Sequence, residues 1–336
     1  MSNMDSMVEY TKPSWIRVLE VRLFSKLNPD KKSYNSIIYG NYTNPDSEQL
    51  SISITGSKKI ASNQNNCTIK IINMTYEDIL KITMGEYYYV EIWVGYRMGD
   101  IFKWFEGEVA YISPKLNNHK DTEVTILCAS KLVAQYTQQR MGIALNSGIN
   151  LYAALNYVTD RAGIKTSFNS STLKNEFLNK AISAVDTPKA LLELIADQQN
   201  LDLYTDTSMG DIVNITTASD KRQIKINPDT ISFLQGNPTI NSNGLDIYLL
   251  PTFDFQVGDI IIINHALVNI NSDNLSSAQK DFKANYMDTA LVGTGKENRG
   301  YGMYIIKNID FTFQNRGSSF SIHINGRAVS LLYGDA

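Results

Sequence analysis

The sequence contains few of the residues on which disulfide, metal or thiol chemistry depends. Only two cysteines occur in 336 residues, Cys67 and Cys128, so a disulfide framework is excluded. Each lies in an alternating apolar run, which predicts two reduced packing residues and assembly in a reducing compartment. The three histidines, His119, His265 and His323, are far apart, and none is spaced from another histidine or a cysteine as zinc ligands are. We therefore expect no metal site.

Long apolar runs and runs of positive charge are also missing. No apolar stretch approaches the roughly 20 residues that a membrane-spanning helix needs, and the apolar run 258–264 is only as long as a strand. The N-terminus has neither the cationic start nor the apolar segment of a signal peptide. The formal net charge is −3, and the longest cationic clusters are pairs such as Lys31-Lys32. We expect a soluble chain that is not exported by the general route, with no membrane insertion and no specific nucleic-acid binding.

The first third of the chain is predicted to be rich in strands. Short runs there alternate apolar and polar residues, as half-buried strands do. Turn residues, Gly56 and Gly85 among them, separate the runs. One short helix is expected over 75–81, with Thr75 as its N-cap. The predicted strands are 15–24, 50–54, 67–72, 87–96, 105–112 and 122–128, and so many short strands favour a barrel or a sandwich.

The middle of the chain changes to helical spacing. Apolar residues from Leu151 to Val158 recur as on one face of a helix, and Gly163 is suited to end it. A second helix is predicted after Thr187-Pro188, where a capping residue precedes a first-turn proline. A hairpin over 201–204 and 212–216 is expected to follow. This pattern predicts a small α/β unit.

The last third returns to strands, at 244–250, 257–263, 301–313 and 318–325. Between them lies the polar stretch 269–299, which we interpret as a long excursion with a helical turn around 278–282. Excursions of this length in a folded domain are usually functional or disordered.

The two β-rich regions resemble each other. In each region a glycine opens an apolar strand, a second glycine lies in the next strand, and a third strand follows. Gly107 and Cys128 are 21 residues apart, as are Gly302 and His323. The first two glycines are 22 residues apart in the first region and 44 in the second, which indicates an insertion of 22 residues in the polar stretch. We infer an internal repeat, which would give an oligomer twice as many equivalent positions as chains.

No set of residues indicates a reaction. The sequence has no Gly-x-Ser-x-Gly elbow and no Cys–His pair in a recognisable context. The segment 293–300 is similar to a phosphate loop, but Glu297 follows Lys296 where a hydroxyl is needed. Glu106 and Glu108 flank Gly107 and are interpreted as solvated or interface-facing carboxylates. We therefore assign no catalytic, cofactor-binding or metal-binding residue, and we expect no cofactor.

Four segments of the first β-rich region follow an order that resembles the first barrel of phage baseplate hub proteins. They are an apolar strand ending in Asn, a Gly-led turn, a strand ending in Gly-Tyr, and the pattern Phe-x-Gly-x-Val, at 67–74, 84–85, 90–96 and 101–109. Residues 181–194 resemble the small α/β unit of these proteins. Residues 234–238, 243–251 and 257–259 resemble their second barrel. Each motif is degenerate, and only their order over 15–330 is specific.

The resemblance implies a mainly β fold with a smaller α/β part, in which two tail-tube-like β-barrels are separated by a small α/β domain. The sequence departs from the family pattern at the polar stretch and at two extra residues, Lys103 and Trp104, before Phe105. The predicted domains are an N-terminal arm over 1–14, a first tube-like β-barrel over 15–136, a small α/β domain over 137–224, and a second tube-like β-barrel over 225–336 with a polar insertion near 269–299.

The resemblance also implies a structural protein and not an enzyme. In such hubs three chains form a pseudo-sixfold ring, which adapts the hexameric tail tube to a trimeric spike. The expected partners are two further copies of the chain, the spike, the tube protein or a tube initiator, and a tape-measure protein. The expected location is the tail baseplate of a phage or of a tail-like bacteriocin, assembled in the host cytoplasm.

Two alternatives remain at this point. A wall-degrading enzyme or a receptor-binding adhesin would need convergent carboxylates, a metal cluster or exposed aromatics on one face. The tyrosines at 87–89 alternate between faces, so about half of them are expected in the core. A hexameric tail-tube subunit is the other alternative, although the duplication and the length of the chain argue against it.

Overall fold

Most of the chain belongs to strands that run side by side. The computed structural model describes residues 16–25, 36–43, 50–59, 65–97, 99–117, 121–129, 139–164, 166–168, 173–199, 202–206, 212–216, 222–226, 234–236, 238–241, 244–264, 269–270 and 301–328. Within these ranges, fourteen strands form one sheet with the order β17-β14-β15-β19-β18-β3-β4-β7-β6-β5-β1-β2, and β16 and β13 branch from β18. The protein is therefore mainly β with a small helical part, as the sequence predicted.

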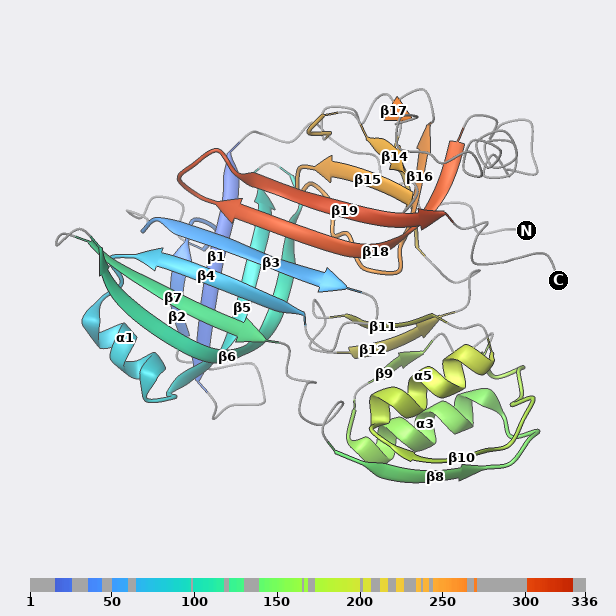
Figure 1. Cartoon of the computed structure of the whole chain (residues 1–336). Coiled ribbons are helices and arrows are strands. Elements are labelled where there is room, and N and C mark those ends of the chain that lie inside the picture. Colours follow the sequence, from blue (N-terminus) through green and yellow to red (C-terminus); the bar gives the residue numbers. More distant parts are fainter. Residues whose placement is uncertain are drawn as a thin grey trace.

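The sheet has a front layer and a back layer. In Figure 1 the strands β15, β19, β18, β3, β4 and β7 run side by side across the front, while β1, β2 and β5 cross behind them. The first half of the sheet contains β1 (Arg17–Ser25), β2 (Ser36–Gly40), β3 (Ile52–Lys59), β4 (Asn66–Ile72), α1 (Tyr76–Thr83), β5 (Tyr87–Tyr96), β6 (Ile101–Asn117) and β7 (Asp121–Ala129). The second half contains β13 (Gln223–Ile226), β14 (Thr239–Asn241), β15 (Gly244–Leu249), β16 (Ile260–Asn264), β17 (Asn269–Ile270), β18 (Tyr301–Gln314) and β19 (Phe320–Ala328).

The two halves repeat one strand order. The first half runs β3-β4-β7-β6-β5-β1, and the second runs β14-β15-β19-β18-β16-β13. The pairings agree in direction, except that β1 pairs antiparallel with β5 whereas β13 pairs parallel with β16. The internal repeat that the sequence indicated is thus present in the strand order, although the two halves diverge at this outer strand.

The register at the start of each half matches the predicted glycines. Gly85 and Gly258 both adopt positive φ, of 75° and 94°, in the turn that precedes the strand. Five residues further on, Val90 pairs with Gly107, and Ile263 pairs with Gly302. Gly107 and Gly302 therefore occupy equivalent positions.

The equal 21-residue spacing, by contrast, does not mark equivalent residues. Val109, two residues after Gly107, pairs with Cys128. Tyr304, two residues after Gly302, pairs with Ala328, and His323 pairs with Asp310. The hairpin between β18 and β19 is longer than the one between β6 and β7, so Cys128 and His323 lie at different levels of the repeat.

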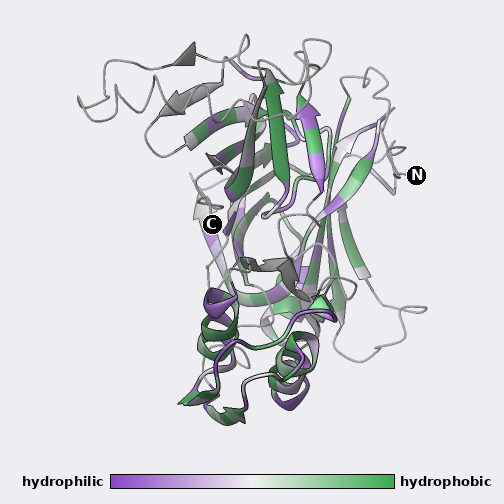
Figure 2. Ribbon diagram, turned by 90° about the vertical axis from the view of Figure 1, so that its right-hand side faces the viewer, coloured by the Kyte–Doolittle hydropathy of each residue, from purple (hydrophilic) through white to green (hydrophobic). Residues whose placement is uncertain are grey.

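The helical part lies at one end of the molecule in both views (Figures 1 and 2). Its elements are β8 (Met141–Leu145), α3 (Leu151–Ala162), β9 (Thr166–Phe168), β10 (Ile182–Asp186), α5 (Pro188–Gln198), β11 (Asp202–Asp206) and β12 (Ile212–Thr216). Thr187 caps α5 by accepting from the amide of Ala190, and Gly163 ends α3 with φ of 66°. Both helices confirm the prediction, and Asn150, the cap of α3, was not anticipated.

Two hydrophobic clusters hold the fold together. One spans both halves of the large sheet and joins residues as distant in sequence as Leu19 and Ile324. The other is confined to the helical part, between Ile143 and Ala196. A cluster that is shared by both halves ties their stability together, because apolar area removed from water is the main favourable term in folding. The exact division into four domains stays a prediction.

Several local expectations need correction. Gly56 was expected in a turn but lies inside β3. The short strands β2, β8, β10, β13, β14 and β17, and β9 beside the predicted β11–β12 hairpin, were not expected. The N-terminal arm, the helical turn around 278–282, the segment 293–300, His119 and His265 lie outside the described residues.

Candidate functional site: the joint between two copies of one strand order

The two halves are joined edge to edge by a pair of strands. β3 from the first half pairs antiparallel with β18 from the second, from Ser53 opposite Gln314 to Lys59 opposite Asn308. Asn315 extends the joint, since its side chain accepts from the amide of Ile52 at 2.8 Å and donates to the carbonyl of Leu50 at 2.7 Å. Backbone hydrogen bonds therefore run without interruption from one copy to the other.

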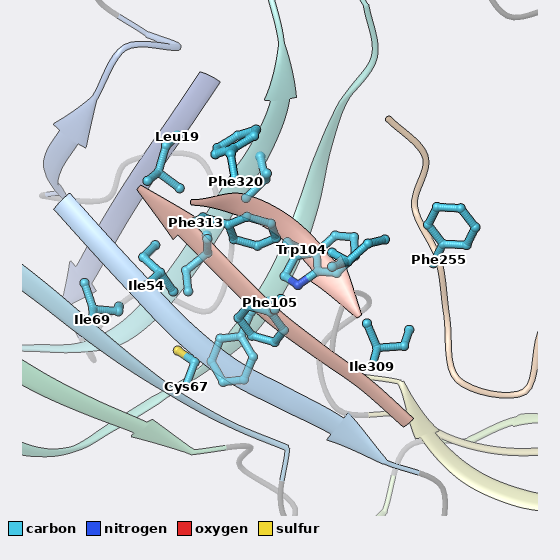
Figure 3. Close-up of a cluster of buried hydrophobic side chains, with 14 of the residues drawn as sticks. Leu19, Ile54, Cys67, Ile69, Trp104, Phe105, Phe255, Ile309, Phe313 and Phe320 are labelled. Carbon is cyan, nitrogen blue, oxygen red and sulfur yellow. The ribbon is translucent and has the colours of Figure 1, made fainter. Parts of the chain in front are cut away.

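Aromatic side chains fill the core beneath this joint (Figure 3). The indole of Trp104, from β6, meets the rings of Phe311 and Phe313 of β18 edge-on, with centroids 5.8 and 5.5 Å apart. Phe313 also packs on Phe320 of β19 at 5.4 Å, and Phe320 meets Tyr96 of β5 at 5.6 Å. Edge-to-face pairs at this distance are worth about 0.5–1.5 kcal/mol each beyond the area that they bury.

A β-bulge explains how Trp104 reaches the core. Ile92 pairs with Phe105 and Trp93 pairs with Lys103, so Trp104 is the unpaired extra residue of β6. Successive strand residues normally point to opposite faces, but Trp104 and Phe105 are both fully buried. The bulge turns the extra side chain inward. Trp104 is one of the two extra residues by which the sequence departs from the hub pattern.

Gly56 allows the two strands to approach. A Cβ atom at this position would lie 2.5 Å from the Phe311 ring and 2.5 Å from the carbonyl oxygen of Asn66. Any larger residue would therefore push Phe311 out of the aromatic cluster. We predicted Gly56 in a turn, but it lies in the middle of a strand. The close contact with Phe311 explains why this strand position requires a glycine.

The face of the sheet opposite the core is mostly polar and crosses the joint. One row of directly paired residues on this face runs Tyr248, His323, Asp310, Ser57 and Asn66. His323 stacks on Tyr248 with centroids 4.1 Å apart, and its Nε2 lies 2.7 Å from Asp246 Oδ1.

A parallel row on the same face is built mainly of small hydroxyl side chains. Its members are paired in order across β19, β18, β3, β4 and β7, and they are Ser321, Thr312, Thr55, Thr68 and Leu127. Both copies thus present one continuous polar surface.

Two strands at equivalent positions, β6 and β18, differ in what pairs with them. The first part of β18 pairs with β16, and residues 308–314 pair with β3 on the same side. The first part of β6 pairs with β5 through Glu108. Among the residues that the structure describes, no strand pairs with 109–117 on that side of β6. Within the described residues, the position that β3 fills in the second half therefore has no counterpart in the first.

The residues that the sequence singled out do not converge on a reaction centre. Cys67 and Cys128 are buried and directly opposite each other on β4 and β7, and burial raises the pKa of the Cys67 thiol. Both side chains belong to the hydrophobic cluster of the large sheet, which confirms the packing interpretation. Glu106 is buried and bonded to Lys103 Nζ, so its interpretation as a solvated carboxylate was wrong. The tyrosines at 87–89 are all half-buried, and none is fully in the core.

The predicted glycine turn of the second half contains an ion pair between the buried Asp259 and the exposed Arg222, which the sequence did not reveal. Asp259 accepts from Arg222 Nε at 3.1 Å and Nη2 at 2.5 Å, and from the amide of Gln256 at 2.8 Å. Burial raises the pKa of Asp259, and the bonds from Arg222 and Gln256 oppose the shift. These contacts fix the turn before β16.

In the described ranges, no three histidine, cysteine, aspartate or glutamate side chains gather as metal ligands would. None of the helices there has the length and apolar character required to cross a bilayer.

Comparison with known proteins identifies the fold. Neither a protein-family model nor a curated protein matches the sequence. Among solved structures, the tail protein from Neisseria meningitidis MC58 superposes with a TM-score of 0.50 at 11% identity, over 95% of this chain and 99% of that one. The 43 kDa tail protein of prophage MuSo2 from Shewanella oneidensis matches at 0.47 and 13% identity, over 93% and 98%. The E. coli c3393 protein, a component of the type VI secretion system, matches at 0.47 and 9%, over 86% and 77%.

The fold is similar to that of the Neisseria tail protein, and the match extends over nearly the whole of both chains. The sequence resemblance to tail and baseplate proteins is thus confirmed at the level of the fold. Within the described residues, the chain has a duplicated strand order whose two copies are joined internally by β3 and β18.

Proposed function

We propose that the chain is a structural baseplate hub subunit, and that three copies form a pseudo-sixfold ring between a hexameric tail tube and a trimeric spike. The observation that carries the proposal is the β3–β18 joint between two copies of one strand order. Three such chains would present six equivalent copies, which matches a sixfold partner on one side and a threefold partner on the other. The tail-protein fold supports the same assignment.

The continuous polar face is the surface that we assign to the channel of this ring. It is built mainly of hydroxyl, amide and mixed charged side chains, with the exposed Tyr248 and Leu127 at the ends of its two rows, and it is polar at the joint itself, at Asp310 and Ser57. A surface of this kind gives a passing chain neither a large apolar patch nor a strong field of one sign to bind to. On this proposal the protein works through its interfaces and catalyses no reaction.

We assign separate roles to the predicted domains. The tube-like regions 15–136 and 225–336 would form the ring, and the α/β region 137–224 would lie outside it. The expected partners are the spike, the tube protein or its initiator, and a tape-measure protein. The expected location is the baseplate of a phage or of a tail-like bacteriocin.

Native mass spectrometry of the purified chain, alone and then mixed with its spike protein, tests the proposal. A species of three chains, each of 37.7 kDa, is the expected result. A species of six chains would instead identify a tail-tube subunit. A strict monomer in both conditions would overturn the ring and favour an enzyme or an adhesin.

A further inference from the structure

Cys67 and Cys128 are far apart in the sequence, but the fold places their thiols side by side. The two residues lie directly opposite each other on the neighbouring antiparallel strands β4 and β7. Every second residue of each strand is buried there, and both cysteines belong to the buried set, each with 2% of its surface exposed. Both side chains therefore point into the large hydrophobic cluster, in which Figure 3 labels Cys67.

The geometry of this pair matches that of a disulfide. Directly opposite residues of antiparallel strands have Cα atoms about 4.5 or 5.5 Å apart, depending on the hydrogen-bond pattern of the pair. Both values lie within the roughly 4.4–6.8 Å over which two cysteines can be bridged. The thiols are already in contact, since burial first and then a hydrogen bond with Cys128 raise the pKa of the Cys67 thiol. An S–S bond therefore needs rotation about side-chain bonds and no rearrangement of the strands.

We infer that Cys67 and Cys128 are a site of oxidative modification, at which a small-molecule disulfide converts the two thiols into a cross-strand disulfide bond. The inference goes beyond the proposed function and does not depend on the ring. The pair is the one place in the described part of the chain where two cysteines meet.

The reaction is two successive thiol–disulfide exchanges. The thiolate of one cysteine attacks a sulfur of the small disulfide RSSR, which forms a mixed disulfide and releases RS⁻. The thiolate of the other cysteine then attacks the cysteine sulfur of the mixed disulfide, which forms the Cys67–Cys128 bond and releases a second RS⁻. The two cysteine protons pass to the released thiolates. The pair thus loses two electrons, and RSSR is reduced to two RSH.

The position of the pair in the ladder gives the oxidant a route to buried sulfur. Among the paired positions of β4 and β7, only Asn66 with Ala129 lies beyond the two cysteines on that side. The end of a ladder opens more readily than its middle, so a local opening exposes both thiols. Burial raises the pKa of the Cys67 thiol, and only the thiolate reacts. Burial therefore slows the reaction but leaves unchanged the geometry that favours its product.

The bond would change the stability of the first half of the sheet. It would join the two ends of a segment that contains α1, β5 and β6. A cross-link between residues far apart in sequence stabilises a fold chiefly because it restricts the unfolded chain. In a reducing compartment the thiols stay free, and outside it they would be oxidised. Oxidation would thus strengthen this half after the chain has folded.

Equilibration of the whole purified chain with glutathione tests the inference. The chain is incubated with mixtures of reduced and oxidised glutathione, in native buffer and in urea that unfolds it, and free thiols are then alkylated. Peptide mass spectrometry measures the fraction of chains in which Cys67 is bonded to Cys128. A disulfide that fits the folded state is favoured by folding as much as it favours folding. We expect the equilibrium constant for the bond to be at least about tenfold larger in native buffer.

Chains that start fully oxidised show whether equilibrium has been reached. They are prepared by oxidation in urea, returned to native buffer, and incubated with the same glutathione mixtures. Agreement between the reduced and the oxidised starting material removes slow access to the buried thiols as an explanation of the result.

A matched control moves one cysteine out of register. In the variant Cys67→Ala with Ile69→Cys, both thiols remain on the buried face of the same strands, but position 69 is opposite Ile126. Diagonal neighbours are about 7–8 Å apart, which is too far for a disulfide without backbone movement. The equilibrium constant of this variant should be no larger in native buffer than in urea. Circular dichroism checks that the variant is folded.

Two results would overturn the inference. One is an equilibrium constant that is no larger in native buffer than in urea, because folding would then not favour the bond. The other is an equal gain in the control, because compaction of the chain would then explain the bond without any specific pairing. Neither readout depends on the number of chains in a ring, so the hub assignment and the disulfide can fail separately.

Discussion

At the scale of single residues, the joint depends on side chains whose positions differ from those that the local sequence pattern predicts. Trp104 is an extra residue that a bulge turns into the core, and Gly56 is a strand glycine that gives Phe311 its space. Lys58, also buried, lies over the Trp104 ring with Nζ 4.4 Å from its centroid. Because these groups pack closely together, a substitution at one of them is expected to disturb the packing of the others.

Trp104→Ala is expected to lower the free energy of unfolding by about 3–5 kcal/mol, because it leaves a cavity beside the rings of Phe311 and Phe313. Urea denaturation followed by circular dichroism measures the loss. The control is Trp93→Ala, since Trp93 is only half-buried and lies against Arg22. An equal loss of stability in both variants would contradict the conclusion that Trp104 stabilises the core beneath the joint.

Asp259→Asn should change the pH dependence of stability. The pKa of Asp259 is raised by burial, so the folded state holds this proton more tightly than the unfolded state does. The resulting stabilisation is present below the ordinary Asp pKa of 3.8 and is lost as the pH rises through the folded value. The variant should therefore gain stability relative to the wild type as the pH rises from about 4 to about 7. Denaturant titrations over this range measure the difference, and a constant or shrinking difference would be evidence against the shift.

At the scale of elements, residues close together in the sequence determine where the helices begin and which strand residues face the core. Thr75 and Thr187 each accept from the amide three residues on, and both caps were predicted from the sequence. The helical part has its own hydrophobic cluster, to which α5 contributes Leu191, Leu192 and Ile195.

Thr187→Ala should destabilise this helical part by about 1 kcal/mol, because the first turn of α5 loses its side-chain acceptor. Thr187→Asp should keep the cap and most of the stability. Denaturation followed by helical circular dichroism distinguishes the two variants. Equal losses would mean that the contact contributes through something other than capping.

The sequence predicted the main strands, both long helices and the repeat, because these depend on periodicity and on capping residues close in the chain. It missed short strands such as β8 and β13, whose five and four residues carry too little pattern. The joint itself brings Ser53 beside Gln314, and no local signal encodes a contact at that separation. The matching 21-residue spacing was a coincidence, because hairpin length differs between the halves.

At the scale of the whole molecule, one sheet and one large hydrophobic cluster include both copies. The β3–β18 ladder has seven paired positions, and on the β4 and β19 sides its strands continue into regular antiparallel pairs. The two halves are therefore expected to unfold together.

Hydrogen exchange of the native monomer tests this cooperativity. Amides at the β3–β18 joint should exchange within about tenfold of those between β4 and β7, since both would open only in a shared unfolding step. If the joint exchanged far faster, the halves would be opening independently.

The internal joint also has a consequence for the kinetics of assembly. A contact between segments of one chain forms at a rate that does not depend on protein concentration, whereas a contact between chains needs an encounter in solution. In a ring of three chains, half of the joints would already be made when each chain finishes folding. The rate of ring formation would then fall less steeply on dilution than it would for a ring of six separate subunits.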